Sequence, residues 1–355
     1  MTLRSSLVST ERALPRPARN ARQGWSTRAA CIITLRSDDG GCGSGEASPL
    51  PGFSPDSLGA CEAALRALDP STLPARLAPG QSLAEALASA SQRLPAALPA
   101  ARAALECALL DLWARAAGKP AWDLIGGQHQ PAPTPRSVAA LLQGEPETAC
   151  AQAQAAQARG VRCFKLKIGR AHAIERELAA VQLLRAELGP DVRLRLDANQ
   201  SFSARQAEHY LPRFAAHDIE LVEEPCAPPE LARVAYLPLP LAFDESLGAL
   251  TPGELTRSVF ALVLKPALLG GISACFAWAE AARRTGARVI LSHTFDGPLG
   301  LMLSAALALG LGAESCAHGL DVHGAGLDDQ GLPGFSGAEL HAWSELGLGL
   351  REAAP

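Results

Sequence analysis

Three short apolar segments of the sequence each end in an acidic residue, and these acids are Asp197, Glu223 and Asp244. They are 26 and 21 residues apart, a spacing that fits one strand and one helix per step. If three successive parallel strands carry them, their carboxylates meet at one edge of a barrel. Carboxylates are ligands for hard divalent cations, so the pattern predicts a site for Mg²⁺, for which Mn²⁺ can substitute.

Lysine residues flank this trio on both sides. Lys165 and Lys167 are two residues apart on a predicted strand, so both side chains point to the same face. Because adjacent buried ammonium groups repel, we expect each to lower the pKa of the other, which lets a lysine act as a base near neutral pH. Lys265 ends a later strand. It is interpreted as a second acid or base, as a cation beside a developing anion, or as a structural partner of an acid. A cation with lysines on both sides predicts proton removal next to the carboxylate of a small-molecule substrate.

Other polar residues follow the same predicted strands. Arg195 points the same way as Asp197 but one layer deeper, where it either contacts the substrate through water or pairs with a buried acid. Asn199 is expected to bond a ligand or a metal-bound water. Glu224 and Glu245 each follow a predicted ligand, and strand alternation predicts that they point away from the metal. Four residues after or beside the last two strands are expected to line the pocket rather than bind zinc: His293, Asp296, His318 and His323.

Composition excludes several classes of protein. The chain has 355 residues, of which 48% are hydrophobic and 19% charged, as in an ordinary globular protein. A net charge of -4 gives no electrostatic support for a nucleic-acid partner. No apolar run approaches the roughly 20 residues that span a bilayer. The nine cysteines form no CxxC pair, so we expect reduced, buried thiols and a cytoplasmic location. The oligomeric state is not predicted.

From about residue 135 the sequence alternates regularly between short apolar strands and Ala-rich helical stretches. Strands are expected near residues 137–142, 163–168, 192–197, 219–223, 241–244, 260–265, 288–292 and 317–321. Helices are expected near residues 146–159, 173–188, 203–216 and 271–285. Eight strands with intervening helices predict a parallel β/α barrel, with its active site at the C-terminal ends of the strands. The short segments after the fourth and fifth strands predict single-turn helices there.

The first third of the chain mixes strands and helices. The first 30 residues are rich in Arg and Ser, as in an organellar transit peptide, but they alternate like strands over Leu3–Leu14 and Trp25–Leu35, and we expect a folded hairpin. Residues 38–41 predict a turn, and the glycine-rich stretch 41–46 is interpreted as hairpin and loop. Helices are expected near residues 55–68, 82–95 and 97–117.

The motifs occur in a familiar order. Lys-x-Lys, Asp-Ala-Asn, Glu-Glu-Pro, Asp-Glu-Ser and Lys-Pro, in this sequence, resemble the enolase superfamily in the branch that includes muconate lactonizing enzymes. Residues 45–54, GEASPLPGFS, are similar to the GE-x-x-PLPGFS signature of o-succinylbenzoate synthases. Arg195 and Ser292 also match positions found in those synthases. The loop at residues 292–297 departs from the serine-rich form expected there.

The resemblance implies an α/β fold: a (β/α)7β TIM-like barrel over residues 131–325, with an α+β capping domain formed by residues 1–130 and the returning tail 326–355. It assigns Asp197, Glu223 and Asp244 as Mg²⁺ ligands, Lys167 as the base with Lys165 beside it, and Lys265 as the facing cation. Substrate contacts are expected from Arg195, Asn199 and Ser292.

The implied activity is that of a lyase. It converts 2-succinyl-6-hydroxy-2,4-cyclohexadiene-1-carboxylate into 2-succinylbenzoate and water, through lysine proton abstraction and an enediolate, in menaquinone biosynthesis. The alternatives are an N-succinylamino acid racemase or another epimerase of the superfamily. Dipeptide epimerases carry an Asp-x-Asp pair after the last strand, whereas this chain has Asp321-Val322-His323. A non-catalytic relic would have lost ligands or lysines, and all six positions are filled.

The resemblance implies that two loops close the mouth of the barrel. Residues 15–24 are polar and basic, and Arg16, Arg19 and Arg22 either contact the distal carboxylate of the substrate or stay in solvent. Residues 49–54 should be stiffer, because two prolines fix φ.

Overall fold

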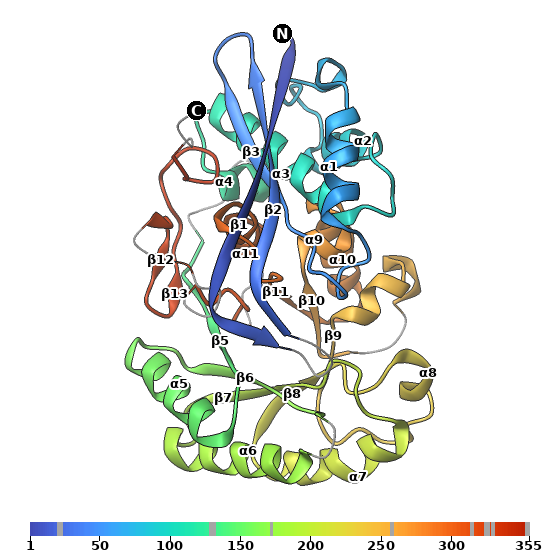
Figure 1. The fold of residues 1–355 in the computed structure, drawn as a ribbon, viewed down its shortest axis with the longest axis vertical. Coiled ribbons are helices and arrows are strands. Elements are labelled where there is room, and N and C mark those ends of the chain that lie inside the picture. The colour runs from blue at the N-terminus through green and yellow to red at the C-terminus, as the bar shows by residue number, and fades with distance from the viewer. Residues whose placement is uncertain are drawn as a thin grey trace.

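A seven-stranded parallel sheet forms the centre of the computed structural model, which describes residues 1–19, 24–127, 133–170, 173–255, 259–312, 316–322, 327 and 331–351. Its strands are adjacent in chain order: β5 (Ala139–Leu142), β6 (Cys163–Lys167), β7 (Arg193–Asp197), β8 (Ile219–Glu223), β9 (Leu241–Phe243), β10 (Ala261–Leu264) and β11 (Arg288–Leu291). Figure 1 shows this sheet curled, with helices along its outer face. The first seven of the eight predicted barrel strands are therefore confirmed.

The last predicted strand is reduced to isolated bridges that join the two ends of the sheet. The Ala139 N–H donates to the His318 carbonyl at 2.8 Å, and the Gly319 N–H donates to the Leu291 carbonyl at 2.9 Å. The segment near residue 318 therefore lies between β5 and β11 and closes the ring.

The barrel helices lie where the sequence placed them. They are α5 (Pro146–Ala158), α6 (Ile174–Leu188), α7 (Ala204–Ala215) and α10 (Ile272–Thr285), and only short turns follow β8 and β9: α8 (Pro228–Leu231), η2 (Glu245–Ala249) and η3 (Pro252–Glu254). Two helices described in the barrel were not predicted, α9 (Pro266–Leu269) and α11 (Pro298–Gly310). Every residue from Leu301 to Leu309 is buried, so α11 has no polar face and no helical periodicity. No helix among the described residues is both long and apolar enough to cross a bilayer.

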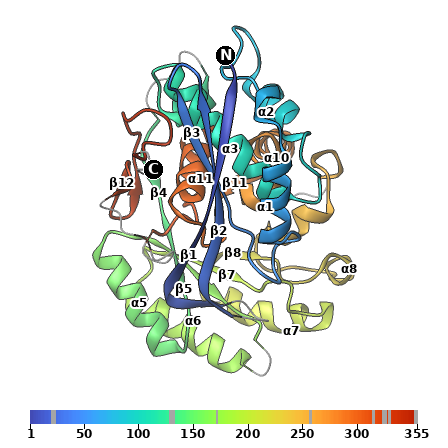
Figure 2. The same ribbon diagram turned by 45° about the horizontal axis from the view of Figure 1, so that its top comes forward.

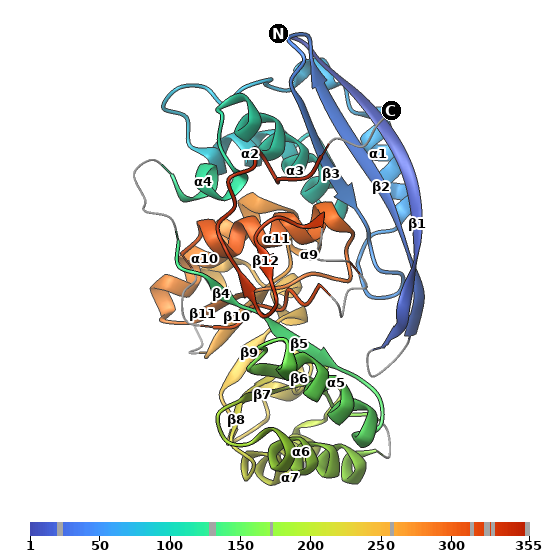
Figure 3. The ribbon, with the colours of Figure 1, turned by 90° about the vertical axis from the view of Figure 1, so that its left-hand side faces the viewer.

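A three-stranded antiparallel sheet and four helices form the cap. β1 (Leu3–Arg19) pairs with β2 (Gly24–Ser37), which pairs with β3 (Cys42–Ala47), and the helices are α1 (Leu58–Ala67), α2 (Leu83–Ser91), α3 (Pro99–Ala116) and α4 (Ala121–Gly126), with a 3-10 turn, η1 (Pro70–Thr72). Figures 2 and 3 show the long β1–β2 hairpin running from the cap along the barrel.

The predicted lid loop at residues 15–24 is wrong in its limits. Strands β1 and β2 both continue into this segment. Their pairing is irregular between Ala13 and Ala18, after which Ala18 lies opposite Trp25 and Arg19 opposite Gly24. Arg22 and the side chains of Arg16 and Arg19 lie outside the described residues. Their predicted contacts therefore stay predictions.

The glycine-rich stretch 41–46 belongs mostly to strand β3 rather than to a loop. A Cβ atom on Gly45 would overlap the Ala104 carbonyl, and one on Gly43 would overlap the Ala108 carbonyl. The glycines are therefore what lets α3 lie directly on the cap sheet.

The C-terminal tail packs on both parts of the molecule. β12 (Phe335–Ser336) and β13 (Glu339–Leu340) form a small sheet with β4 (Arg136–Ser137). Further along, the Leu348 N–H donates to Asp111 of α3 at 2.8 Å. We therefore propose the division into a cap of residues 1–130, a barrel of 131–325 and a returning tail of 326–355.

The close approach of α3 to β3 predicts that Gly45→Ala lowers the free energy of unfolding by about 1–3 kcal/mol or more, because the added methyl group overpacks the contact. Gly59→Ala is the matched control, since nothing lies within 4 Å of the added atom on α1. There alanine should be neutral or stabilise by up to about 1 kcal/mol. Denaturant unfolding measures both, and equal effects of the two substitutions would contradict the packing account.

Candidate active site

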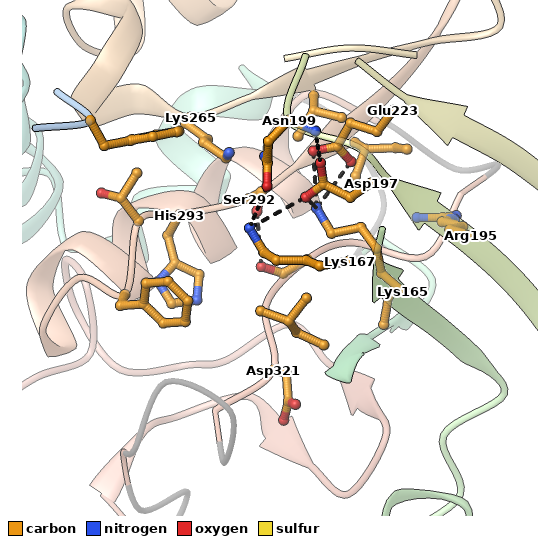
Figure 4. Close-up of a pocket in the computed structure, with 18 of the residues that line it drawn as sticks. Lys165, Lys167, Arg195, Asp197, Asn199, Glu223, Lys265, Ser292, His293 and Asp321 are labelled. Carbon is orange, nitrogen blue, oxygen red and sulfur yellow. Dashed lines mark hydrogen bonds and ion pairs between the residues drawn. The ribbon is translucent and has the colours of Figure 1, made fainter. Parts of the chain in front are cut away.

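The three predicted carboxylates lie side by side at the strand ends. Asp197 is the last residue of β7 and is in register with Glu223, the last residue of β8. Asp244 directly follows β9. All three side chains are buried, with at most 4% of each residue exposed. Figure 4 shows Asp197 and Glu223 together at one edge of the pocket.

The lysines approach this group from two sides. Lys165 Nζ lies 3.0 Å from both carboxylate oxygens of Glu223 and 3.3 Å from Asp197 Oδ2. Lys167 Nζ lies 3.6 Å from Asp197 Oδ2. Lys265 contacts Asp244 and reaches the pocket from the side opposite Lys165 (Figure 4). The structure thus brings all six predicted residues into one site.

Burial and pairing shift the pKa values of these groups in opposite directions. Burial raises the pKa of Glu223 to about 7 even though Lys165 opposes it. Burial likewise raises the pKa of Asp244 to about 6 against the effect of Lys265. For Asp197, the three lysines outweigh burial and lower the pKa. Glu223 and Asp244 therefore have too little positive charge around them to offset their burial, as expected of a cation site, whereas the lysines stabilise the ionised form of Asp197.

The predicted lowering of the lysine pKa is wrong for Lys165. Burial acts to lower the pKa of Lys165, but Asp197, Glu223 and Asp244 outweigh it and raise that pKa. The pKa of Lys265 is also raised, because Asp244 and Glu223 outweigh burial. Attraction by carboxylates exceeds the repulsion between lysines on which the prediction rested.

The donor set fits a divalent cation in its chemistry. All three side chains offer hard oxygen atoms, and they come from neighbouring strand ends. Among the described residues, no three acidic, histidine or cysteine side chains are arranged closely enough to hold a metal ion. Lysine ammonium groups contact the carboxylates instead: Lys165 contacts Asp197 and Glu223, and Lys265 contacts Asp244. Binding of Mg²⁺ by Asp197, Glu223 and Asp244 would require these ammonium groups to withdraw.

Glu224 and Glu245 differ from each other in orientation. Glu224 points away from the lysines, as predicted, and accepts hydrogen bonds from the Asp244 and Ser246 N–H groups at 2.7 and 2.8 Å. Glu245 was expected to point away, but its Oε1 accepts from Asn199 Nδ2 at 2.9 Å. The chain enters the 3-10 turn η2 at this point, so strand alternation no longer applies.

The three predicted substrate-contact residues all line the pocket. Asn199 has a positive φ of 43° and accepts from Lys167 Nζ at 3.0 Å. Arg195 pairs with Glu220, while its buried Nη2 has no hydrogen-bond partner among the described residues. Ser292 Oγ donates to the Gly319 carbonyl at 3.3 Å.

Aromatic side chains from the cap form the mouth of the pocket. The Phe53 ring centroid lies 5.4 Å from Lys265 Nζ. Trp25 packs edge-on against Phe53 at 6.4 Å and donates its ring N–H to the Pro51 carbonyl at 2.9 Å. Sequence reasoning missed Trp25, which carries no local signal of this contact.

Of the residues that follow the last strands, some line the pocket and others are buried in the barrel wall. His293 lines the pocket as predicted, whereas His318 is fully buried in the wall, where its Nδ1 accepts from the Leu291 N–H at 3.0 Å. His323 lies outside the described residues. Asp321 lines the pocket, but Figure 4 shows its carboxylate turned away from the lysines.

Lysine is rare in this chain except in the pocket. Of 32 lysine and arginine residues only four are lysine, and three of these line the cavity: Lys165, Lys167 and Lys265. Arginine stays protonated in proteins, whereas a lysine can lose and regain a proton. The selective use of lysine here therefore favours proton transfer over simple charge pairing.

Comparison with known proteins identifies the family. Residues 148–351 match the family model described as enolase C-terminal domain-like, and residues 4–126 match the N-terminal domain of mandelate racemase / muconate lactonizing enzyme. The chain belongs to the enolase superfamily. It is 30% identical over 309 residues to the L-Ala-D/L-Glu epimerase of Bacillus subtilis (strain 168), covering 83% of this chain and 81% of that protein. It is also 30% identical over 319 residues to the o-succinylbenzoate synthase of Desulfotalea psychrophila, covering 81% of this chain and 84% of that protein.

Solved structures of superfamily members share the fold. The substrate-liganded L-Ala-D/L-Glu epimerase from Bacillus subtilis has a TM-score of 0.85 at 26% identity, covering 100% of this chain and 99% of that chain. The muconate lactonizing enzyme from Pseudomonas fluorescens has a TM-score of 0.83 at 26% identity, covering 98% and 95%. The predicted capped barrel is confirmed.

His293 gives a prediction for stability against pH. Burial lowers its pKa from 6.5 to about 4, with Arg12, Lys265 and Arg28 adding to the effect and Asp296 opposing it. Between pH 6.5 and 4 the unfolded chain binds a proton that the folded protein does not, so stability falls as the pH falls.

In His293→Gln this part of the pH dependence should disappear. Between pH 7.5 and 5 the wild type should lose on the order of 1–2 kcal/mol more unfolding free energy than the variant. Denaturant unfolding at the two pH values measures this difference. Parallel curves for the two proteins would show that His293 is not held neutral.

Proposed function

We propose that this protein is an o-succinylbenzoate synthase, which dehydrates 2-succinyl-6-hydroxy-2,4-cyclohexadiene-1-carboxylate. The observation that carries the proposal is the position of the PLPGFS loop, which brings the Phe53 ring over Lys265 at the pocket mouth. The flat ring of this substrate, which becomes aromatic in the reaction, can stack on the Phe53 side chain. The lysines and carboxylates beside it can remove a proton next to the ring carboxylate. The chain is 30% identical to a synthase and 30% identical to an epimerase, each over most of its length, so this similarity supports the family and does not by itself choose the reaction.

The lysines carry the proton in this proposal. Lys167 Nζ, as a free amine, takes the proton from the carbon next to the ring carboxylate and becomes an ammonium. It then returns a proton to the hydroxyl group, which leaves as water while the ring becomes aromatic. Lys265 is the cation beside the carboxylate as negative charge builds there. The Lys165 ammonium contacts Glu223 and Asp197 before the metal ion binds, and in this proposal it withdraws from them when the carboxylates take up Mg²⁺.

The cofactor in this proposal is Mg²⁺, held by Asp197, Glu223 and Asp244. When bound, it would supply charge stabilisation to the substrate carboxylate. Asn199 and Arg195 orient the reacting centre, Asn199 through its bond to Lys167.

Racemisation of N-succinyl amino acids is the second candidate. It is favoured by the placement of Lys167 and Lys265 on opposite sides of the pocket, where each could reach one face of an α-carbon (Figure 4). A dipeptide substrate is less suitable, because its free ammonium group needs an acid. Asp321 turns away from the lysines, and histidine stands two residues later.

The base assignment predicts that Lys167→Ala lowers kcat for dehydration by about 10²–10⁴-fold, the usual contribution of a general base. Lys119→Ala is the matched control, because Lys119 pairs with Asp123 away from the pocket and is the remaining lysine of the chain. Dehydration is followed by formation of 2-succinylbenzoate. Wild-type turnover by Lys167→Ala would exclude Lys167 as the base.

Deuterium exchange at the α-carbon of N-succinyl amino acids separates the two candidate reactions. If Lys265→Ala exchanges one enantiomer but no longer racemises it, Lys265 is a base for that substrate. A wild-type enzyme that racemises N-succinyl amino acids but leaves the cyclohexadiene unchanged would reject the synthase proposal.

The carboxylate trio predicts that activity requires Mg²⁺ or Mn²⁺ and is lost in EDTA. Asp244→Asn should weaken Mg²⁺ binding at least 10-fold, because one anionic ligand is lost, while the thermal unfolding temperature changes little. Calorimetric titration with Mg²⁺ measures the affinity. Full activity in chelator, or unchanged affinity in the variant, would remove the trio from metal binding.

A further inference from the structure

The loop between β11 and α11 carries a polar group that the proposed chemistry does not use. His293 lines the pocket beside Ser292 and Lys265 (Figure 4). Its Nδ1 accepts a hydrogen bond from the Asp296 N–H at 3.2 Å. A neutral imidazole with an acceptor at Nδ1 carries its proton on Nε2. Among the described residues Nε2 has no hydrogen-bond partner, and the ring is partly open to the cavity.

Two arginines of the cap hold this loop in place. Arg12 Nη2 donates to the Phe295 and Asp296 carbonyls at 2.6 and 2.8 Å, and Arg28 Nε donates to Phe295 at 3.2 Å. The arginines are directly opposite each other on β1 and β2. Like charges in that position repel, so the loop carbonyls and Asp296 compensate for an unfavourable pair.

The loop is also fixed from its other side. Asp296 Oδ1 accepts from Thr294 at 2.7 Å and from Ser48 at 3.1 Å, and Glu46 accepts from the Gly297 N–H at 2.6 Å. Phe295 keeps a positive φ of 57°, a conformation that non-glycine residues seldom adopt. Contacts from the cap and contacts within the loop thus hold the His293 imidazole in one orientation.

We propose that His293 determines substrate specificity by donating its Nε2–H to an acceptor oxygen on the arm of the substrate that lies away from the carboxylate–lysine centre. Arg12 and Arg28 are positioning residues for this contact. The inference rests on the proposed function, in which that arm is the succinyl group. The same donor disfavours an arm that ends in an ammonium group, because two donors would face each other.

The test is calorimetric binding of 2-succinylbenzoate and of 2-butyrylbenzoate, which lacks the distal carboxylate. His293→Phe removes the donor and should weaken 2-succinylbenzoate binding by about 10- to 100-fold, whereas His293→Gln, which keeps a donor, should stay within about threefold. Weakening of both ligands by the Phe variant identifies the ketone as the acceptor, and weakening of 2-succinylbenzoate alone identifies the carboxylate. Unchanged binding of both ligands, or equal loss in the Phe and Gln variants, overturns the inference.

The positioning role has its own readout. Arg12→Gln should weaken 2-succinylbenzoate binding in the wild-type background but add little to His293→Phe, because both substitutions remove the same contact. Arg4→Gln, on the exposed part of the same strand, is the control and should have no effect. Fully additive losses for Arg12 and His293 would reject the coupling.

Failure of the proposed function is distinguishable from failure of this inference. If the wild type neither binds 2-succinylbenzoate nor dehydrates the cyclohexadiene, the synthase proposal fails. The same variants are then measured with N-succinyl amino acids, whose arm has the same acceptor oxygens. An unchanged KM for these substrates in His293→Phe, or no turnover by the wild type, also rejects the role of His293.

Discussion

The constraint on which this molecule depends is the burial of three carboxylates within reach of one another. Asp197, Glu223 and Asp244 repel each other in a site with little water, and burial holds the pKa values of Glu223 and Asp244 at about 7 and 6. A group of buried carboxylates is stable only where positively charged side chains are held close to it. The parallel strands achieve this, because neighbouring strands supply Lys165 and Lys265 on either side of the acids. In the proposed function, the same positions would hold a metal ion and transfer a proton.

The cap contributes the part of the site that the barrel lacks. Phe53 closes the pocket over Lys265, and the packing of α3 on the glycines of β3 sets where the cap sheet lies. Arg12 and Arg28 then link the cap hairpin to the loop that carries His293. In the proposed function, proton transfer is therefore the task of the barrel, and the choice of substrate is shared between the cap and the barrel.

Much of this arrangement is predictable from the sequence, because each acid ends an apolar segment and the segments recur at the period of a β/α unit. The helix α11 is not predictable in this way, because its sequence is hydrophobic throughout and has no helical periodicity. The orientation of Glu245 is missed because alternation holds only while the backbone is extended. The raised pKa of Lys165 depends on three acids from other strands. The bond between Arg28 and Phe295 spans 267 residues and leaves no local trace.

The most direct test is nuclear magnetic resonance of the lysine side chains, because the chain has only four lysines and Lys119 lies outside the site. Protein with isotope-labelled lysine is titrated with pH, with and without Mg²⁺. If Mg²⁺ displaces the lysine ammonium groups from the carboxylates, it should lower the pKa values of Lys165 and Lys265 and leave the Lys119 resonance unchanged. Lysine resonances and titration curves that are identical with and without Mg²⁺ would contradict the account.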